Sequence, residues 1–469
     1  MTNKLIAPLA PLAAALLLAG CSLMPTYERP AAPVPAQYPG ATAPVGANTP
    51  AAELAWQDYF ADDSLRQLIE TALANNRDLR VAVLNIEQAR AQLGIRRADQ
   101  FPTVNAALTG SRTSTGDAAI TSVYNAGLLV TAYEFDFFGR VASLKEQALA
   151  QYLATTEGSK TAQIALIATV AQSWFALLAD EELLAISKQT LATRQDSLKL
   201  VQLRLDNGAT SELELRQAQS LLETAHVTLA QQQRQRALDE NALVLLLGQA
   251  MPSDVRERLA TTQLTQLRLP ELPAGLPSDL LTRRPDIKQA EQQLIASNAN
   301  IGAARAAFFP RISLTAGAGS ASNALAGLFK DGAWGFSLAP QLLLPIFDAG
   351  RNQAGLDSAK AGRDIAIAQY EKSIQSAFRE VADALAGRDT LTEQLRAQQA
   401  QTEAETQRRR LTDLRYQNGA ASLLDSLDAQ RSLFGSQQAL VQTRLTYLQN
   451  QVVLYKTLGG GATGAAVQP

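Results

Sequence analysis

Two carboxylates three residues apart are the feature of this sequence that most suggests chemistry. Asp425 and Asp428 lie in a stretch of helical periodicity, so their side chains share one helix face. Two acids on a helix commonly form a solvated surface. If several such pairs were crowded together, repulsion between like charges would raise some of their pKa values, and the ring would favour cations. The pair therefore predicts either a solvated face or a cation-selective constriction.

Other reactive residue types are scarce. The chain of 469 residues has one histidine, His226, and one cysteine, Cys21. A His/Cys metal site is therefore excluded, and a Ser-His-Asp centre would need His226, which lies on a helical stretch without a nucleophile-elbow motif. We predict no catalytic residue, no metal site, no cofactor and no enzyme activity. The net charge of −2 gives no basic footprint for nucleic acid, and the run Arg408-Arg409-Arg410 is interpreted as a solvated helix face.

The only cysteine lies at the end of a predicted signal peptide. Residues 1–20 have one charged residue, Lys4, and then an apolar run that is too short for a membrane-spanning helix. Leu18-Ala19-Gly20-Cys21 resembles a bacterial lipobox, in which the cysteine is acylated and becomes the first residue of the mature chain. Ser22 follows the cysteine, at the position where an Asp would resemble a signal for retention in the inner membrane. The resemblance therefore favours the outer membrane. Residues 21–64 are rich in Pro and Ala and are predicted to form an extended arm that begins to pack near Trp56.

The rest of the chain is an internal repeat. Residues 78–102 align without gaps on residues 286–310 at an offset of 208, with Gly94 matching Gly302. Residues 139–248 align on residues 350–459 at an offset of 211. All of the length change lies between residues 102 and 139, and because length changes concentrate in loops, that segment should contain one.

Alternating apolar and polar residues predict a β-hairpin in each half. The strands are expected at 104–111 and 129–137, with a turn-like segment at 111–122, and in the second copy at 312–319 and 334–346. Leu129, Tyr133 and Phe135 share one parity and are expected on one face of their strand. Pro340 and Pro345 do not suit a central strand, so we expect a bulge or bend there.

Helical patterns surround the hairpins. Residues 141–206 and 352–417 lack proline and predict two helices on the order of 100 Å long, which require a coiled-coil setting. Shorter helices are predicted at 77–100, 211–247, 285–308 and 422–458, so that two short helices match one long helix in each half. Asn-Gly turns at 207–208 and 418–419 suit helix C-caps. Ser211 and Ser422 then resemble capping-box residues of the returning helices.

Four strands cannot close a barrel, and an open sheet edge cannot face lipid. Strands of about 9–11 residues are long enough to cross a bilayer. A chain anchored to a membrane with four such strands must therefore either keep them outside the bilayer or pool them with other chains. Three chains would give twelve strands, above the usual minimum of about eight.

Several motifs, in order, resemble the TolC-type outer-membrane factor family, and its lipoprotein branch in particular, which serves RND-type tripartite drug-efflux pumps. The similarity runs from Cys21 to about Gly460, and its motifs are at residues 56–82, 280–294, 308–316, 344–351, 416–433 and 454–460. The resemblance implies a homotrimer with a transmembrane β-barrel shared by three chains and a long α-helical barrel in the periplasm. It also implies docking to a periplasmic adaptor (membrane fusion) protein and an inner-membrane RND-type transporter.

The same resemblance assigns roles at the helical tips. Asp425 and Asp428 match the aspartate ring of the periplasmic aperture, Leu424 matches an apolar constriction residue, and Tyr416 and Arg431 match positions that hold the closed state through contacts between helices. Glu214 and Gln217 stand at the equivalent positions of the first half, so we expect the second tip to bend inward and the first to remain straighter. The candidate adaptor contacts are Asn207, Gly208, Ala209, Ser211, Asn418, Gly419, Ala420 and Ser422.

The sequence thus predicts an α+β membrane protein that acts as the outer-membrane channel of a tripartite efflux pump. A protein-secretion channel, a metal-efflux channel and a periplasmic coiled-coil scaffold lipoprotein remain alternatives. The expected segments are a signal peptide (1–20), an acylated arm (21–64), a first repeat (65–248, hairpin about 102–138), a linker and equatorial segment (249–284), a second repeat (285–459, hairpin about 310–348) and a flexible tail (460–469).

Overall fold

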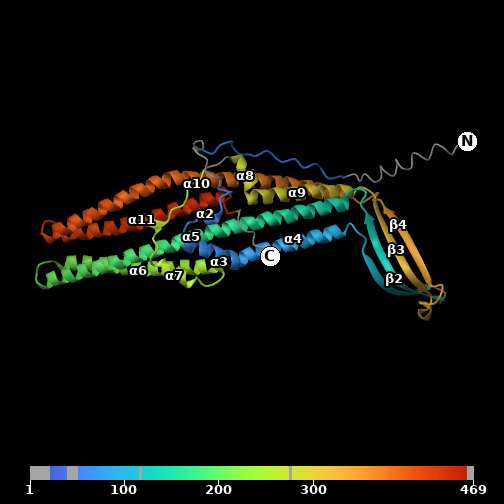
Figure 1. The fold of residues 1–469 in the computed structure, drawn as a ribbon, viewed down its shortest axis with the longest axis horizontal. Helices are drawn as coiled ribbons and strands as arrows, with labels where there is room; N and C mark the ends of the chain where they lie inside the picture. Colours follow the sequence, from blue (N-terminus) through green and yellow to red (C-terminus); the bar gives the residue numbers. More distant parts are fainter. Residues whose placement is uncertain (1–21, 40–50, 116–118, 274–276, 462–469) are drawn as a thin grey trace. The chain divides into compact units, whose positions relative to one another are not determined.

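A computed structural model describes residues 22–39, 51–115, 119–273 and 277–461 of the chain (Figure 1). Cys21 lies outside the described residues, as do the predicted signal peptide and nearly all of the predicted tail. The chain divides into two compact units, each built from three separate segments. Of the described residues, unit 1 takes those within 22–32, 85–156 and 288–372, and unit 2 takes those within 33–84, 157–287 and 373–461. Each unit therefore draws on both halves of the repeat.

The predicted helices are confirmed, with shifts of one or two residues at their ends. Two helices of 67 residues, α5 (Arg140–Asp206) and α10 (Arg351–Gln417), are the longest elements. The predicted short helices are α4 (Arg77–Ala98), α6 (Glu212–Leu247), α9 (Pro285–Ala306) and α11 (Leu423–Thr457). The remaining elements are α2 (Trp56–Tyr59), α3 (Asp63–Asn75), α7 (Ser253–Leu259), α8 (Pro277–Arg283), η1 (Leu264–Gln266) and η2 (Leu325–Gly327).

Unit 1 contains a four-stranded antiparallel sheet of β1 (Val104–Thr115), β2 (Ala119–Phe135), β3 (Arg311–Ser322) and β4 (Trp334–Leu343). The strands pair in the order β1-β2-β3-β4, so β1 and β4 are its edges. The turn predicted over residues 111–122 was too long, because the two strands pair as far as Thr115 and Ala119. Ser111 pairs with Val123 and Ser114 with Ile120, so both strands continue through that polar stretch. Small hydroxyl residues fit a pleated surface when cross-strand neighbours support them.

A β-bulge in β2 changes which side chains of the strand share a face, so the predicted faces were wrong. The β2–β3 register shifts between Val130 and Tyr133, and Ala132 takes a positive φ of 49°. Because one extra residue moves every later side chain to the other face, Leu129 does not share a face with Tyr133. Tyr133 instead continues the face of Leu128 and Val130.

The bulge expected at Pro340 is absent. Pro340 pairs with Leu314 in an unbroken β3–β4 register. A proline is tolerated here because β4 is an edge strand of the chain's sheet, where one N–H can be spared. The strand ends at Leu343, before Pro345, and the chain bends at Ile346, so the expected bend does occur at the second proline.

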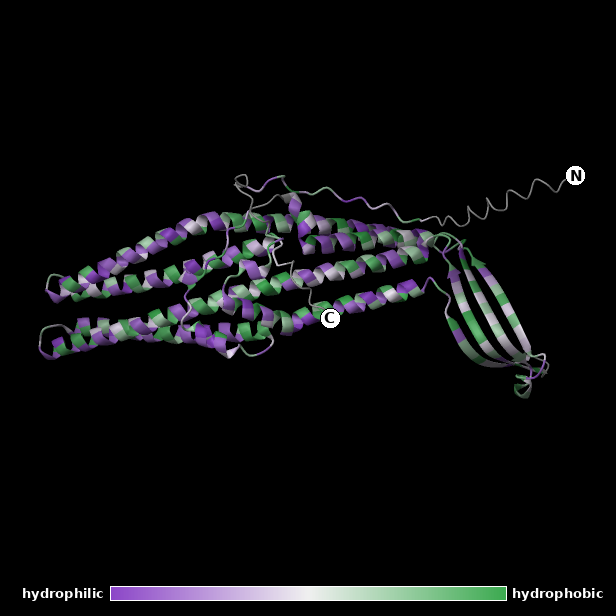
Figure 2. Ribbon diagram, in the orientation of Figure 1, coloured by the Kyte–Doolittle hydropathy of each residue, from purple (hydrophilic) through white to green (hydrophobic). Residues whose placement is uncertain are grey.

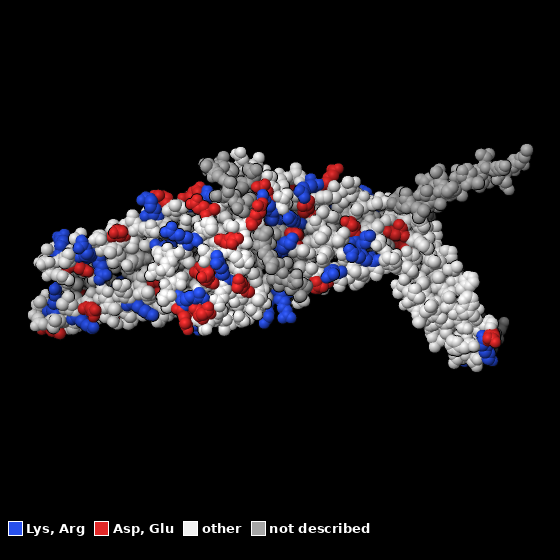
Figure 3. Space-filling model, viewed as in Figure 1, with Lys and Arg blue, Asp and Glu red and all other residues white. Residues whose placement is uncertain are grey.

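The two faces of the sheet differ in chemistry. One face carries large exposed apolar side chains, and Figure 2 shows the resulting alternation along the strands; they include Val104, Leu108, Leu128, Trp334, Phe336, Leu338 and Leu342. Arg112, Glu134 and Arg311 are the charged residues of the four strands. Accordingly, the sheet surface visible in Figure 3 is nearly free of charge along most of its length.

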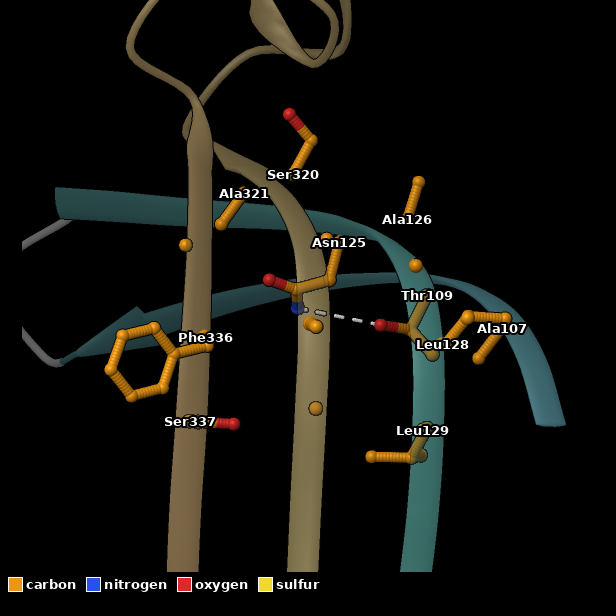
Figure 4. Close-up of a pocket in the computed structure, with 15 residues that line it drawn as sticks. Ala107, Thr109, Asn125, Ala126, Leu128, Leu129, Ser320, Ala321, Phe336 and Ser337 are labelled. Atoms are coloured by element: carbon orange, nitrogen blue, oxygen red, sulfur yellow. Dashed lines mark hydrogen bonds between the residues drawn. The ribbon is translucent and has the colours of Figure 1, made fainter. Parts of the chain in front are cut away.

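The opposite face carries small and polar side chains. A hollow of about 380 Å³ on the sheet is lined by residues of this face and their neighbours, among them Ala107, Thr109, Asn125 and Ser337 (Figure 4). Gly127 pairs directly with Gly319 at its floor, and a Cβ on either glycine would lie within 2.3 Å of a backbone oxygen of the other strand. Glycine is therefore required where these two strands approach each other.

Glu134 fastens the sheet to the helix that follows it. Its carboxylate accepts two hydrogen bonds from Arg140, both at 2.8 Å, and pairs with Arg311 at 2.7 Å. Asp136 accepts from the backbone N–H groups of Val141 and Ala142 and so caps α5. Such charge-assisted bidentate contacts are strong and directional, and they fix the angle at which β2 passes into α5.

Residues 22–39 of the predicted arm form no helix or strand, whereas residues 56–59 form the short helix α2. In unit 1, Leu23 and Pro25 accept hydrogen bonds from Arg305 and Asn298 of α9, and Arg29 pairs with Glu291 at 2.7 Å. In unit 2, Tyr59 and Phe60 are fully buried, and Tyr59 stacks on Tyr455 with ring centroids 4.1 Å apart. The chain thus joins the core of unit 2 near Trp56, as the sequence predicts.

Helix α5 has a stretch long and apolar enough to cross a membrane, judged by length and composition alone. However, 61% of that stretch is buried inside the chain. The buried residues of α5 include Trp174, Phe175, Leu177 and Leu178, which belong to the core of unit 2. We therefore interpret α5 as a core helix whose apolar residues pack against other helices.

Candidate functional site

Two helix–turn–helix tips in unit 2 carry the predicted site residues (Figure 1). The first tip (residues 204–217) joins α5 to α6, and the second tip (residues 415–431) joins α10 to α11. Gly208 and Gly419 have φ values of 70° and 72°. The residue after each glycine closes the turn with a backbone hydrogen bond. The N–H of Ala209 donates to the Arg204 carbonyl, and the N–H of Ala420 donates to the Arg415 carbonyl, both at 2.8 Å. These are glycine C-caps, as the Asn-Gly pairs predict.

Both asparagines fold back onto the helix that they end. The Asn207 amide donates to the Leu203 carbonyl, and the Asn418 amide to the Leu414 carbonyl, each at 2.7 Å. The predicted adaptor-contact residues of both turns are all exposed. Among the residues that the structure describes, no atom beyond the adjacent residues of the turn lies within 4 Å of a Cβ built on either glycine. The turns therefore present a smooth, small-residue surface.

Asp425 belongs to a complete capping box at the second tip. Its carboxylate accepts from the backbone N–H of Ser422 at 3.0 Å, and its own N–H donates to the Ser422 hydroxyl at 3.2 Å. The hydrogen bonds from the Ser422 hydroxyl and backbone N–H, together with the charge of Arg415, lower the pKa of Asp425. Within one chain Asp425 is thus held in its charged form. The crowding that would raise its pKa requires further copies.

Asp428 forms ion pairs with two arginines. Arg431, one turn later on α11, donates to one carboxylate oxygen, and Arg408 of α10 lies 3.4 Å from the other. The run containing Arg408 is therefore not simply a solvated face, because this arginine pairs across two helices. The Arg431 side chain pairs with its own helix, so the contact between helices assigned to it by resemblance remains a prediction.

Tyr416 joins the two tips. Its hydroxyl accepts a hydrogen bond from Arg204 of the first tip, whose guanidinium also lies 4.7 Å from the centre of the Tyr416 ring. Beside this contact lies a buried cluster of residues within or next to the two tips: Val201, Leu215, Ala218, Leu423 and Leu427. Sequence reasoning identified Tyr416 but not Arg204, although Arg204 recurs as Arg415 in the repeat.

Leu424 points away from that cluster. Its side chain is 61% exposed, whereas its neighbour Leu423 is buried. Asp425 is also exposed, so residues 424 and 425 form one uncovered edge of the second tip. An apolar side chain beside a carboxylate on an exposed edge suits a constriction that other copies would complete. The inward bend expected for this tip remains a prediction.

A buried acid lies farther along α5. Asp180 is 5% exposed, and its Oδ2 atom has no hydrogen-bond partner among the described residues. Burial, reinforced by the neighbouring carboxyl group of Asp239, raises the pKa of Asp180 to about 8. Arg236 lies nearby but is shared between Glu181 and Glu240. The helical periodicity of the sequence did not single out this residue.

The sequence model of a known protein family, "Outer membrane efflux protein", matches residues 68–249 and 276–460 of the chain. The chain belongs to the outer membrane efflux protein family. The two matched segments cover most of both halves of the internal repeat.

Individual relatives are similar over nearly the whole chain. The toluene efflux pump outer membrane protein TtgC and the antibiotic efflux pump outer membrane protein ArpC, both of Pseudomonas putida, are each 49% identical over 467 residues, covering 97% of this chain and 96% of theirs. The crystal structure of the open state of the Neisseria gonorrhoeae MtrE outer membrane channel is 40% identical, with a TM-score of 0.87, and the alignment covers 94% of this chain and 99% of MtrE.

Membership of this family confirms the predicted fold class, function and location. The protein is an efflux channel of the outer membrane, and its helices and small antiparallel sheet match those of outer-membrane channels. The family is one of efflux proteins rather than enzymes.

Proposed function

We propose that this chain works as a homotrimeric conduit, in which three four-stranded sheets join into one twelve-stranded barrel and the long helices form a periplasmic tunnel. The observation that carries this proposal is that the same sheet has both an exposed apolar face and two open edges, β1 and β4. Lipid can cover the apolar face but cannot satisfy the backbone groups of an open edge. Closure with other copies satisfies both requirements.

The helical tips would form the periplasmic end of the conduit. There the exposed Asn-Gly turns would contact an adaptor protein, which in turn would connect the conduit to an inner-membrane RND-type transporter. Small residues without protruding side chains allow close approach of a partner's backbone. At the other end of the chain, acylation of Cys21 would add an anchor in the lipid of the outer membrane.

The second tip would hold the gate. Asp425, Asp428 and Leu424 from three chains would surround one aperture, and Tyr416 and Arg431 would help to keep it closed. Six carboxylates in a ring attract cations and repel anions. The Arg204–Tyr416 contact supports a role in closure, because it ties the second tip to the first tip of the same chain.

The cargo would be drugs and organic solvents, by analogy with relatives named for toluene and antibiotic efflux. The conduit would carry out no reaction, because transport energy would come from the inner-membrane partner. Small polar side chains on the inner sheet face offer few selective contacts. Selection among cargoes would therefore reside in the transporter.

Single-channel recording of the purified full chain in planar bilayers tests the proposal. A small, stable, cation-preferring conductance from a sample of confirmed trimeric mass is the expected result. Trimers that give no conductance would contradict the conduit and favour a scaffold role. A monomeric or dimeric mass would contradict the shared barrel, whatever the recordings show.

A further inference from the structure

One arginine is buried in the helical core of unit 2 without an acid to balance its charge. Arg194 of α5 is 3% exposed and forms no ion pair with a carboxylate of the described residues, and burial lowers its pKa. Arg284, which is also buried in unit 2, pairs with both Asp286 and Glu380. A charge taken out of water without a partner costs free energy. Arg194 therefore makes the packed state less favourable than an apolar side chain would.

Arg194 lies where three helices meet. Its Nη1 atom donates to the Leu221 carbonyl of α6 at 2.7 Å, and its guanidinium lies 5.4 Å from the centre of the Phe434 ring of α11. Phe434 is itself only 8% exposed, so α11 shields the charge from water. One hydrogen bond and one cation–π contact replace only part of the hydration that a guanidinium with several N–H donors loses.

This contact belongs to the same interface as the contact between the tips. Arg194 precedes Arg204 by ten residues of α5, about 15 Å along the helix. Val201, between them, belongs to the buried cluster that also contains Leu427 of α11. At the end of the interface, Tyr416 accepts a hydrogen bond from Arg204. The first half of the chain thus meets the second half through one arginine with a hydroxyl partner and one arginine without an acid.

A second polar group of this interface is incompletely bonded. Gln430, one turn before Phe434 on α11, has a buried Oε1 atom that has no hydrogen-bond partner among the described residues. It lines a hollow of about 30 Å³ together with Thr190 and Thr193 of α5 and Arg409 of α10. A hollow of this size is large enough to admit a water molecule. Movement of α11 away from α5 would therefore hydrate both Gln430 and Arg194.

We infer that Arg194 is an opening residue of this channel, whose buried charge lowers the free energy needed to move the second tip away from the first. The inference rests on the proposed gate at the second tip and adds an element that opposes closure. The Arg204–Tyr416 contact would hold the tips together. Arg194 would favour their separation, because its guanidinium regains water as α11 leaves. Two arginines of the same helix would thus act on the gate in opposite directions.

The internal repeat shows that the shared helical architecture does not require a buried arginine at this place. At the offset of 211, Arg194 corresponds to Glu405 and Phe434 corresponds to Glu223. Glu405 is partly exposed and pairs with Arg408 one turn later on α10. The unpaired cation is therefore a property of the first half alone, and it faces the helix that carries the proposed gate.

Substitutions that separate charge from volume test the inference in the full chain. Arg194→Met removes the charge but keeps a long, flexible side chain, and Arg194→Lys is the matched control that keeps the charge. Each is made alone and together with Arg204→Ala, which removes the contact between the tips. Conductance is recorded in planar bilayers from samples of confirmed trimeric mass.

A second measurement reports the interface directly. Leu433→Cys places a thiol in the wall of the hollow between α5, α10 and α11. The rate at which a water-soluble thiol reagent labels this cysteine measures how often α11 moves away from α5. The chain without Leu433→Cys, whose one cysteine is Cys21, gives the background rate.

We expect Arg204→Ala to raise the conductance. Arg194→Met added to it should remove at least about half of that rise, whereas Arg194→Lys should leave the rise in place. Without Arg204→Ala, Arg194→Met should slow the labelling of Leu433→Cys by about threefold or more and raise the melting temperature, because the packed state no longer contains an unpaired charge.

Unchanged or faster labelling, a lower melting temperature or loss of the trimer in Arg194→Met would overturn the inference, because the arginine would then fasten the helices or have no effect on them. Equal effects of Arg194→Met and Arg194→Lys would also overturn it, since the charge would be irrelevant. If Arg204→Ala left the conductance unchanged while Arg194→Met still slowed labelling, the proposed closing contact would be wrong and the role of Arg194 would stand.

Discussion

The first and second tips share a turn but differ in the residues around it. Arg204 and Arg415 are equivalent in the repeat, yet Arg204 reaches across to Tyr416, whereas Arg415 bonds to the Ala420 carbonyl of its own turn. The reason lies one residue later, where Leu205 in the first half is replaced by Tyr416 in the second. A duplicated turn has thus acquired two uses. One tip supplies an arginine, and the other supplies the acceptor and the exposed acids.

The N-termini of the two helices that follow the turns, α6 and α11, also differ. Ser422 and Asp425 exchange hydrogen bonds in a complete capping box. Ser211 accepts a single bond from the Glu214 N–H, at 3.4 Å, and no reciprocal bond is formed. The second tip is therefore the more firmly built of the two, and it is also the tip that carries the proposed gate. Firm local structure suits a gate that moves as a rigid element.

We expect the largest effect from removing the two acids of the second tip, measured as a change in the conductance of the channel. In Asp425→Ala/Asp428→Ala, removal of the carboxylate ring leaves Arg431 without its carboxylate partner and Arg408 paired with Glu405 alone. Conductance should therefore rise by about twofold or more, and the cation preference should fall. The matched control is Glu214→Ala/Gln217→Ala at the first tip, which should record close to the unsubstituted protein in planar bilayers. Equal changes from the two double variants would show that the tips are equivalent and that the gate lies elsewhere.

A pH series separates the buried acid of the helical core from the exposed acids of the second tip. The folded-state pKa of Asp180, about 8, lies above the unfolded value of about 4, so protonated Asp180 stabilises the fold at low pH. That stabilisation should be lost as the pH rises from about 4 to about 8. We expect the melting temperature in detergent to fall over this window, and Asp180→Asn to flatten the fall.

Asp428→Asn is the matched control, since it removes an exposed acid of the second tip and should leave the pH dependence of the unsubstituted protein in place. If Asp180→Asn kept the full slope, another group would be responsible for it.

A smaller effect is expected from the contact between the tips. Tyr416→Phe removes the hydroxyl that accepts from Arg204 but keeps the ring beneath the guanidinium, and should cost about 0.5–1.5 kcal/mol in the free energy of unfolding. A double-mutant cycle with Arg204→Ala, read by denaturant unfolding, should give a coupling energy of about 1 kcal/mol. Arg415→Ala with Tyr416→Phe is the comparison cycle. A coupling there as large as with Arg204 would remove the distinction between the two arginines.

The smallest effect concerns the caps. Ser422→Ala breaks a reciprocal pair and should lower the free energy of unfolding by about 1 kcal/mol, whereas Ser211→Ala should cost about half of that or less. Because the pKa of Asp425 is lowered, its part of the cap is present above the ordinary aspartate range and is lost as the pH falls through the folded pKa. Thermal melts of both variants at neutral pH and near pH 3 would measure this, and a larger loss for Ser211→Ala would reverse the proposed ranking.

Much of the fold was visible in the sequence, because its signals are local. The lack of proline over 141–206 predicted α5 almost to the residue, and the Asn-Gly pairs predicted both C-caps. The errors came where neighbours in space decide. Strand pairing carried β1 and β2 through a polar stretch that has the composition of a turn, and the bulge at Ala132 moved Tyr133 and Phe135 to the face opposite Leu129.

For the candidate site, the sequence by itself determined which residues stand at the tips and that the two halves differ there, since both follow from the repeat and from helical periodicity. It also determined the family, through motifs that run along nearly the whole chain. Only the tertiary structure decided that Arg204 meets Tyr416, that Arg408 reaches Asp428 and that Asp180 is buried beside Asp239. These partners are 212, 20 and 59 residues apart in the chain, and such contacts depend on how helices pack, which no local pattern specifies.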